Sequence, residues 1–220
     1  MNRKIKFAPG EFYHLYNRGN DKRRIFMDVS DHQRFIKLLF YCNTTEPVNF
    51  REIPKGVTFA DYLRGDTLVD IGAYCLMPNH FHLLVHEKND NGITIFMRKL
   101  ATAYSMYFNV KNERKGKLFE GPFLSSHADS DDYLKYLFAY IHLNPIKLIE
   151  PKWKETGLMD GSNASDFLDS YEYSSYSDYL GKHRDYGEII AKEAFPDYFK
   201  EDTEFEQYIA DWLNYKDLQR

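Results

Sequence analysis

The run VDIGAYCLMPNHFHLLVH at residues 69–86 decides the fold of this 220-residue chain. It contains two stretches rich in β-forming side chains, residues 69–77 and 81–85, which are separated by the turn-prone Pro78 and its neighbours. Two such stretches around a short turn are typical of a β-hairpin. The run therefore predicts two paired antiparallel strands.

The second strand of this hairpin carries a histidine pair. Successive side chains point to opposite faces of a strand. Phe81, Leu83 and Val85 therefore point into a core, whereas His80 and His82 share the other face, about 7 Å apart along the strand. At that spacing both imidazole rings can converge on one metal ion. A lone His-x-His on a strand also fits two half-exposed histidines without a ligand.

Outward from the hairpin, periodicity and capping residues predict the remaining elements. A strand at 12–17 precedes a helix that begins at Ser30 or Asp31, and a loop or insertion follows at 43–66. Beyond the hairpin we expect a helix from Thr94 to about Asn112, a strand at 121–127 and a helix from Asp131 to Leu143.

The predicted order is therefore β-α-β-β-α-β-α. An antiparallel sheet with helices on one face is the natural α+β arrangement for this order, of the ferredoxin-like type. After Pro151 the composition becomes acidic and rich in tyrosine. We interpret residues 1–150 as a catalytic domain and residues 151–220 as a helical C-terminal appendage, in which 202–213 is the clearest helix.

Composition limits the class of protein. The chain is 43% hydrophobic and 17% aromatic, enough for a core without disulfides. Its two cysteines, Cys42 and Cys75, form no CxxC pair, which suits a reducing cytoplasm. No signal-peptide pattern and no apolar run of about 18 residues is present in the sequence. We expect a cytoplasmic protein without membrane or small-molecule partners.

Charge is divided unevenly along the chain. The net charge is −4, but residues 150–220 carry 8 Lys and Arg against 17 Asp and Glu, so residues 1–149 are net positive. Screening restricts surface charges to about 8 Å, so a local basic face can coexist with an acidic tail. Eight basic residues are candidates for DNA phosphate contacts, although solvated faces explain any one of them equally well: Arg18, Arg23, Arg24, Arg98, Lys99, Arg114, Lys115 and Lys117.

A second motif follows in the helix predicted at 131–143, where Tyr140 and Asn144 are spaced i and i+4 on one face. The two imidazoles and the Asn144 carbonyl oxygen would hold a divalent ion that stabilises the transition state of phosphodiester cleavage. Tyr140 Oη would attack phosphorus and form a 5′-phosphotyrosine with a free 3′-OH. A buried tyrosine stripe and an ordinary helix end explain the same motif taken alone.

In combination, these motifs resemble a known family. Leu76-Met77-Pro78-Asn79-His80-Phe81-His82, followed by Tyr140-Ile141-His142-Leu143-Asn144-Pro145, is similar to the REP-associated tyrosine transposases, within the single-tyrosine transposases that share a His-hydrophobic-His motif. Further blocks at 13–20, 107–121 and 173–181 are similar in order and spacing. The sequence departs from the family at Pro122 and Leu124, where the family commonly has basic residues.

The resemblance implies an α+β transposase that nicks and rejoins single-stranded DNA next to a hairpin, with Mg²⁺ or Mn²⁺ as cofactor. It implies Tyr140 as the nucleophile, His80 and His82 as metal ligands and Asn144 as the third ligand. It also favours a monomer over a dimer.

Two other functions stay open on the sequence. One is a catalytically silent nucleic-acid-binding protein that descends from such a transposase. The other is a zinc hydrolase, which needs a third strong ligand and for which Glu120 is the only candidate. The sequence assigns no partner to His14, and it places His142 about 200° around the helix from Tyr140, facing away from the metal.

Overall fold

The computed structural model describes residues 6–54, 56–159 and 161–214. The first part of the chain contains β1 (Phe12–Arg18), η1 (Asn20–Lys22), α1 (Val29–Tyr41), β2 (Val69–Met77), β3 (His80–Glu87), α2 (Gly92–Lys111), β4 (Leu124–His127) and α3 (Asp131–His142). Shorter helices follow: η2 (Asn144–Leu148), α4 (Trp153–Thr156), α5 (Gly161–Ser170), α6 (Tyr176–Tyr179), η3 (Asp185–Ile189), η4 (Lys192–Ala194) and α7 (Asp202–Asn214).

The four strands form one antiparallel sheet in the order β2-β3-β1-β4. Met77 pairs with His80, so only Pro78 and Asn79 form the turn between β2 and β3. The turn is held by the chain after β1, because Ile25 N donates to Pro78 O at 2.9 Å. The predicted hairpin, the β-α-β-β-α-β-α order and the α+β class are confirmed.

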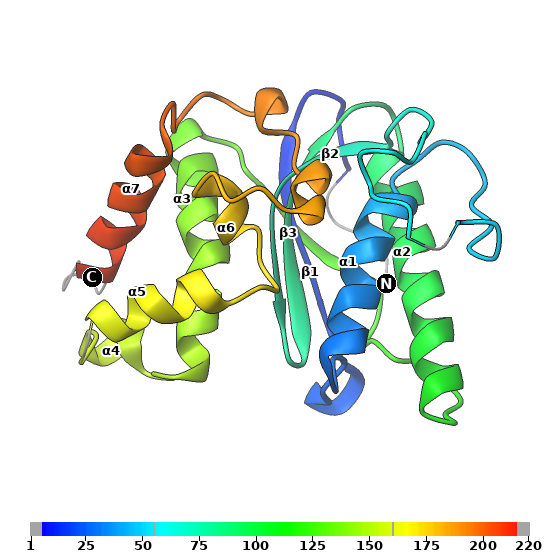
Figure 1. Ribbon diagram of the computed structural model, residues 1–220, viewed down its shortest axis with the longest axis horizontal. Helices are drawn as coiled ribbons and strands as arrows, with labels where there is room; N and C mark the ends of the chain where they lie inside the picture. The colour runs from blue at the N-terminus through cyan, green and yellow to red at the C-terminus, as the bar shows by residue number, and fades with distance from the viewer. Residues whose placement is uncertain (1–5, 55, 160, 215–220) are drawn as a thin grey trace.

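One face of the sheet packs against α1 and α2 (Figure 1). Phe81, Leu83 and Val85 point to this side, as the alternation predicts, and are buried with Tyr13 and Leu15 of β1. Full burial of a side chain of this size stabilises the folded state by about 1.5–3 kcal/mol. This core therefore determines which face of β1 and β3 packs against α1 and α2.

The opposite face is also covered, by α3 and the C-terminal helices (Figure 1). The helices are thus divided between two faces, and are not gathered on one. The reason lies in β2, which is buried along nearly its whole length: Ala73, Cys75 and Met77 point away from α1 and α2, into a second core. Strands that are apolar on both sides require a layer of helices on each.

The C-terminal segment completes the edge of the sheet at β2. Leu76 N donates to Tyr173 O at 2.9 Å, and Ser175 N donates to Tyr74 O at 3.0 Å. An uncovered edge strand would present unpaired backbone groups for association with other chains. The boundary predicted at residue 150 stays a prediction, but the segment after it is packed onto the sheet.

Helix ends lie close to the positions expected. Asp28 caps α1 by accepting a hydrogen bond from Asp31 N, two residues before the predicted Ser30. Ser130 caps α3 by accepting from Tyr133 N, and α7 begins at Asp202 as predicted. None of the helices within the described ranges is long and apolar enough to cross a membrane.

His142 joins α3 to the C-terminal segment. Its Nδ1 lies 2.8 Å from Phe138 O, and its Nε2 lies 2.7 Å from Ser175 Oγ. The ring is fully buried, on the side of α3 away from Tyr140. Burial lowers the pKa of His142 to about 3, so the ring is neutral at pH 7. Nδ1–H then donates to Phe138, and Nε2 accepts from the Ser175 hydroxyl.

This burial predicts a stability that falls in acid. Between pH 6.5 and about 3 the unfolded chain gains a proton at His142 and the folded chain does not. The free energy of unfolding therefore decreases as pH falls through this window, by at most about 1.4 kcal/mol per pH unit from this group. In urea unfolding, His142→Gln should be less stable than wild type at neutral pH but lose less stability on acidification. Equal losses in both proteins would contradict the assignment.

Candidate active site

The second face of the sheet places two histidines from different strands in contact. His14 on β1 and His82 on β3 both point toward α3, and both are buried. Nε2 of His14 and Nδ1 of His82 share a hydrogen bond of 2.8 Å, with the rings stacked 5.0 Å apart. Burial is the main reason that the pKa of each ring is lowered, to about 4 for His14 and well below its usual value for His82. Both rings are therefore neutral at pH 7.

His80 lies beside this pair at the start of β3. Its ring is half-buried, 5.0 Å from the His82 ring and nearly perpendicular to it. Nδ1 lies 2.6 Å from Asn79 Oδ1, so the turn residue orients the ring. Burial lowers the pKa of His80 to about 4, with smaller contributions from the charges of Arg18 and Lys147. A neutral imidazole is the form that binds a metal.

Tyr140 faces the histidines from α3. Its ring centroid is 5.5 Å from that of His14 and 5.5 Å from that of His82, with edge-to-face geometry in both cases. Burial raises the pKa of the Tyr140 phenol above its usual value of 10, and the neighbouring Tyr16 and Tyr133 add smaller increases. At neutral pH the hydroxyl therefore retains its proton until a reaction removes it.

A cleft of about 350 Å³ opens between the sheet and α3 at this point. Its lining residues are His14, Tyr16, His82, Ser126, Tyr133, Tyr136, Leu137 and Tyr140. We call it the site cleft. Aromatic rings dominate its wall, and such rings can stack on unpaired bases. Of the two predicted metal ligands on β3, His82 lines the site cleft directly.

Asn144 is positioned differently from the prediction. The α-helix ends at His142, and Asn144 is the first residue of η2. Its Nδ2 donates to Tyr140 O at 2.7 Å, and its Oδ1 accepts from Lys147 Nζ at 3.0 Å. If Asn144 coordinates a metal, its Oδ1 must bind the ion while Lys147 Nζ lies next to it or moves away.

The donor atoms present fit a metal at the histidines. His82 Nε2 is buried and has no hydrogen-bond partner among the described residues, which is costly for a polar atom unless something binds it. A zinc hydrolase finds less support: within the described ranges, no three His, Cys, Asp or Glu side chains are grouped so as to hold an ion. Glu120 is exposed, and its backbone N donates to Arg18 O.

Three side chains of the site were not anticipated. His14 completes the histidine cluster, and two lysines lie over the Tyr140 ring, with Lys147 Nζ 5.8 Å and Lys154 Nζ 4.8 Å from its centroid. Burial lowers the pKa of both lysines, and for Lys154 the charge of Lys147 adds to the effect. Of the three, only His14 could have been placed from the sequence. On the strand predicted at 12–17, its side chain points to the face opposite to that of Leu15.

Several predicted DNA contacts gather at the His80 end of the sheet. Arg18 pairs with His80 across β1 and β3. The loop after β1 joins the segment before β4 through Asn20 N, which donates to Leu118 O at 2.8 Å. This contact brings together the two basic loops, which carry these exposed or partly exposed cations: Arg23, Arg24, Lys115 and Lys117. Arg114 instead turns back onto α2, donating to Asn109 Oδ1 at 3.1 Å.

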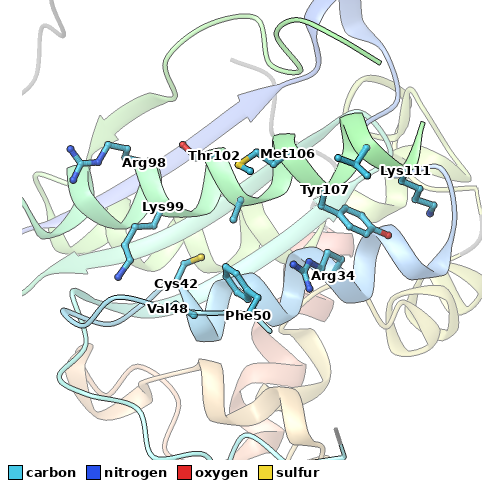
Figure 2. A pocket seen from close by; sticks show the side chains of 12 residues that line it. Arg34, Cys42, Val48, Phe50, Arg98, Lys99, Thr102, Met106, Tyr107 and Lys111 are labelled. Carbon is cyan, nitrogen blue, oxygen red and sulfur yellow. The ribbon is translucent and has the colours of Figure 1, made fainter. Parts of the chain in front are cut away.

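Arg98 and Lys99 lie on the other side of the sheet. They line an open groove of about 770 Å³ between α1, α2 and the 48–50 segment, seen in Figure 2. Lys99 Nζ donates to the carbonyl oxygens of Thr44 and Glu46, at 2.6 and 2.7 Å. The structure therefore separates these two residues from the histidines and Tyr140.

Comparisons with known proteins relate this chain to transposases in sequence and in fold. A family model described as transposase IS200 like matches residues 58–144, a segment that contains His80, His82, Tyr140 and Asn144. No curated protein matches the chain. Among solved structures, a REP-associated tyrosine transposase bound to a REP hairpin matches with a TM-score of 0.50 and 14% identity, over 83% of this chain and 86% of that chain.

The match to the family model includes His82 and Tyr140, which line the site cleft, but not His14 and Tyr16. The resemblance inferred from the sequence is therefore confirmed: residues 58–144 match the IS200-like transposases, and the chain has the fold of a REP-associated tyrosine transposase.

Proposed function

We propose that this protein is a metal-dependent endonuclease and strand transferase that acts on single-stranded DNA next to a hairpin, with Tyr140 as nucleophile. The observation that carries the proposal is the position of the Tyr140 ring, 5.5 Å from both His14 and His82 across one cleft. The match of residues 58–144 to IS200-like transposases supports it. The hairpin partner is proposed because the similar solved structure has a bound REP hairpin.

In the proposed reaction, Tyr140 Oη attacks phosphorus of a DNA phosphodiester. The Oη–P bond forms, the bond from phosphorus to the 3′ oxygen breaks, and the phenol proton passes to solvent. The released 3′ oxygen takes up a proton and becomes a 3′-OH. The covalent 5′-phosphotyrosine retains the energy of the phosphodiester, so attack by another 3′-OH rejoins the strand without ATP.

His80 and His82 are the proposed holders of Mg²⁺ or Mn²⁺, with Asn144 as the third ligand. When bound, such an ion polarises the non-bridging phosphate oxygen and stabilises charge in the transition state. The buried, unpartnered Nε2 of His82 supports this assignment. Imidazole ligands favour Mn²⁺ over Mg²⁺ in affinity.

His14 has a positioning role in this proposal. The pair of neutral rings holds one proton between His14 Nε2 and His82 Nδ1. If His82 Nδ1–H donates to His14, the lone pair of His82 is on Nε2, the atom with no partner. A hydrogen bond to the second nitrogen is the usual way in which proteins fix the tautomer and orientation of a metal-binding histidine.

A monomer suffices for this chemistry, since Tyr140 faces histidines of its own chain.

The alternative function, a silent nucleic-acid-binding protein, is favoured by one observation: Asn144 Oδ1 is hydrogen-bonded to Lys147. A covalent protein–DNA adduct separates the two functions, because binding alone forms no bond to DNA.

The first prediction of the proposal concerns the nucleophile. With Mn²⁺ and end-labelled single-stranded hairpin DNA, wild type should form an adduct that survives a denaturing protein gel and carries the label of the 3′ fragment. Tyr140→Phe should form none, because it lacks the attacking oxygen while its ring is retained. Tyr136→Phe is the matched control, since Tyr136 lies one turn earlier and lines the same cleft; it should still form the adduct.

The outcomes are distinct. An adduct that persists in Tyr140→Phe would show that another tyrosine attacks. The absence of any adduct over many hairpins, with Mn²⁺ binding verified separately, would favour the silent DNA-binding function.

A second prediction concerns His14. His14→Phe retains an aromatic ring but removes the partner of His82 Nδ1, so Mn²⁺ affinity should fall by about 10- to 100-fold. Electron paramagnetic resonance of free Mn²⁺ in a titration measures this directly, without DNA. His127→Phe is the control, because His127 lies on β4 and pairs with Glu11. An unchanged affinity in His14→Phe would remove its proposed role.

A further inference from the structure

Two lysines lie over the ring of Tyr140, the proposed nucleophile, and the proposed reaction gives them no role. Lys147, in η2, and Lys154, in α4, place their ammonium groups 5.8 and 4.8 Å from the centroid of the Tyr140 ring. Both side chains are half-buried, on the side of the site where α3 ends and the chain turns back. We call these two residues the lysine pair.

Among the described residues, no carboxylate forms an ion pair with either ammonium of the lysine pair. The hydrogen bond of Lys147 is to the neutral Asn144 Oδ1, and Lys154 makes neither a hydrogen bond nor an ion pair with any described residue. Two other lysines, by contrast, are neutralised by carboxylates: Lys111 pairs with Asp31 at 2.7 Å, and Lys88 pairs with Asp70 at 3.4 Å. Half-buried like charges repel each other strongly where solvent screening is weak.

The backbone holds the lysine pair in place in spite of this repulsion. Trp153, next to Lys154, is 4% exposed and packs in the second core. Pro145 and Ile146, before Lys147, are buried as well. The two ammonium groups thus come from short helices whose neighbouring residues are fixed, and an anion between them would remove the cost of their proximity.

We propose that Lys147 and Lys154 form a binding site for a single DNA phosphate beside Tyr140. The site rests on the proposed function for its ligand, since a phosphodiester must approach Tyr140 Oη for cleavage. An ammonium group is a compact charge with three donors, suited to the oxygens of a phosphate. Lys147 can in addition link that phosphate to Asn144, and so to the end of α3.

The site predicts a change in the salt dependence of DNA binding. For a protein bound to single-stranded DNA, log affinity falls against log salt with a slope of about −0.7 for each phosphate that the protein neutralises. In a Tyr140→Phe background with EDTA, neither cleavage nor metal contributes. The slope for an oligothymidylate should become shallower by about 0.7 in the double variant Lys147→Gln, Lys154→Gln, because the two lysines contact a single phosphate.

Two variants serve as controls. Lys37→Gln removes the same charge from an exposed position of α1, on the other face of the sheet, and should leave the slope unchanged. Lys154→Arg retains the charge and should retain a slope near that of the parent protein, which separates loss of the contact from loss of the fold. Circular dichroism establishes that each variant is folded.

The result that overturns the proposal is a double variant that is folded and has the slope of the parent protein. This failure is distinguishable from failure of the proposed function. An adduct at Tyr140 together with an unchanged slope would reject the lysine pair alone. A shallower slope without any adduct would retain the phosphate site and reject the cleavage reaction.

Discussion

The buried hydrogen bond between His14 and His82 is the contact on which the site depends. It joins β1 to β3 on the face where α3 packs, and it uses one nitrogen of each ring. Because both rings are buried and neutral, the bond determines which nitrogen of His82 remains free to bind a ligand. The Tyr140 ring packs edge-to-face against both imidazoles, so the position of the proposed nucleophile follows from that of the histidine pair.

The same strands explain why this contact can exist. Phe81, Leu83 and Val85 fill the first core, and this burial fixes the register and the outward direction of His82. A slip of one residue would exchange the two faces, placing the histidines in the first core. The two-residue turn at Pro78 and Asn79 removes that freedom, because it leaves no spare residue between the strands.

Local alternation made the hairpin, the face of His80 and His82 and the α+β class predictable from the sequence. The role of His14 was not predictable, because it requires the pairing of β1 with β3, which are distant in the chain. Lys147 and Lys154 follow Tyr140 at steps of seven residues, which places them on one face only in a continuous helix. The chain instead turns at Pro145 and returns, so tertiary structure alone brings these lysines to the phenol.

The positive charge around Tyr140 has a consequence for the order of binding. Lys147 is hydrogen-bonded to Asn144, the proposed third ligand, so its ammonium and a divalent ion repel each other when both are present without DNA. A bound phosphate would reduce this repulsion on both sides, because its oxygens can contact the ammonium groups and the ion together. Metal and DNA should therefore bind cooperatively, and by linkage each must strengthen the other by the same factor. The unpaired charges of Lys147 and Lys154 would in this way favour the complex with both metal and DNA over a complex with either one alone.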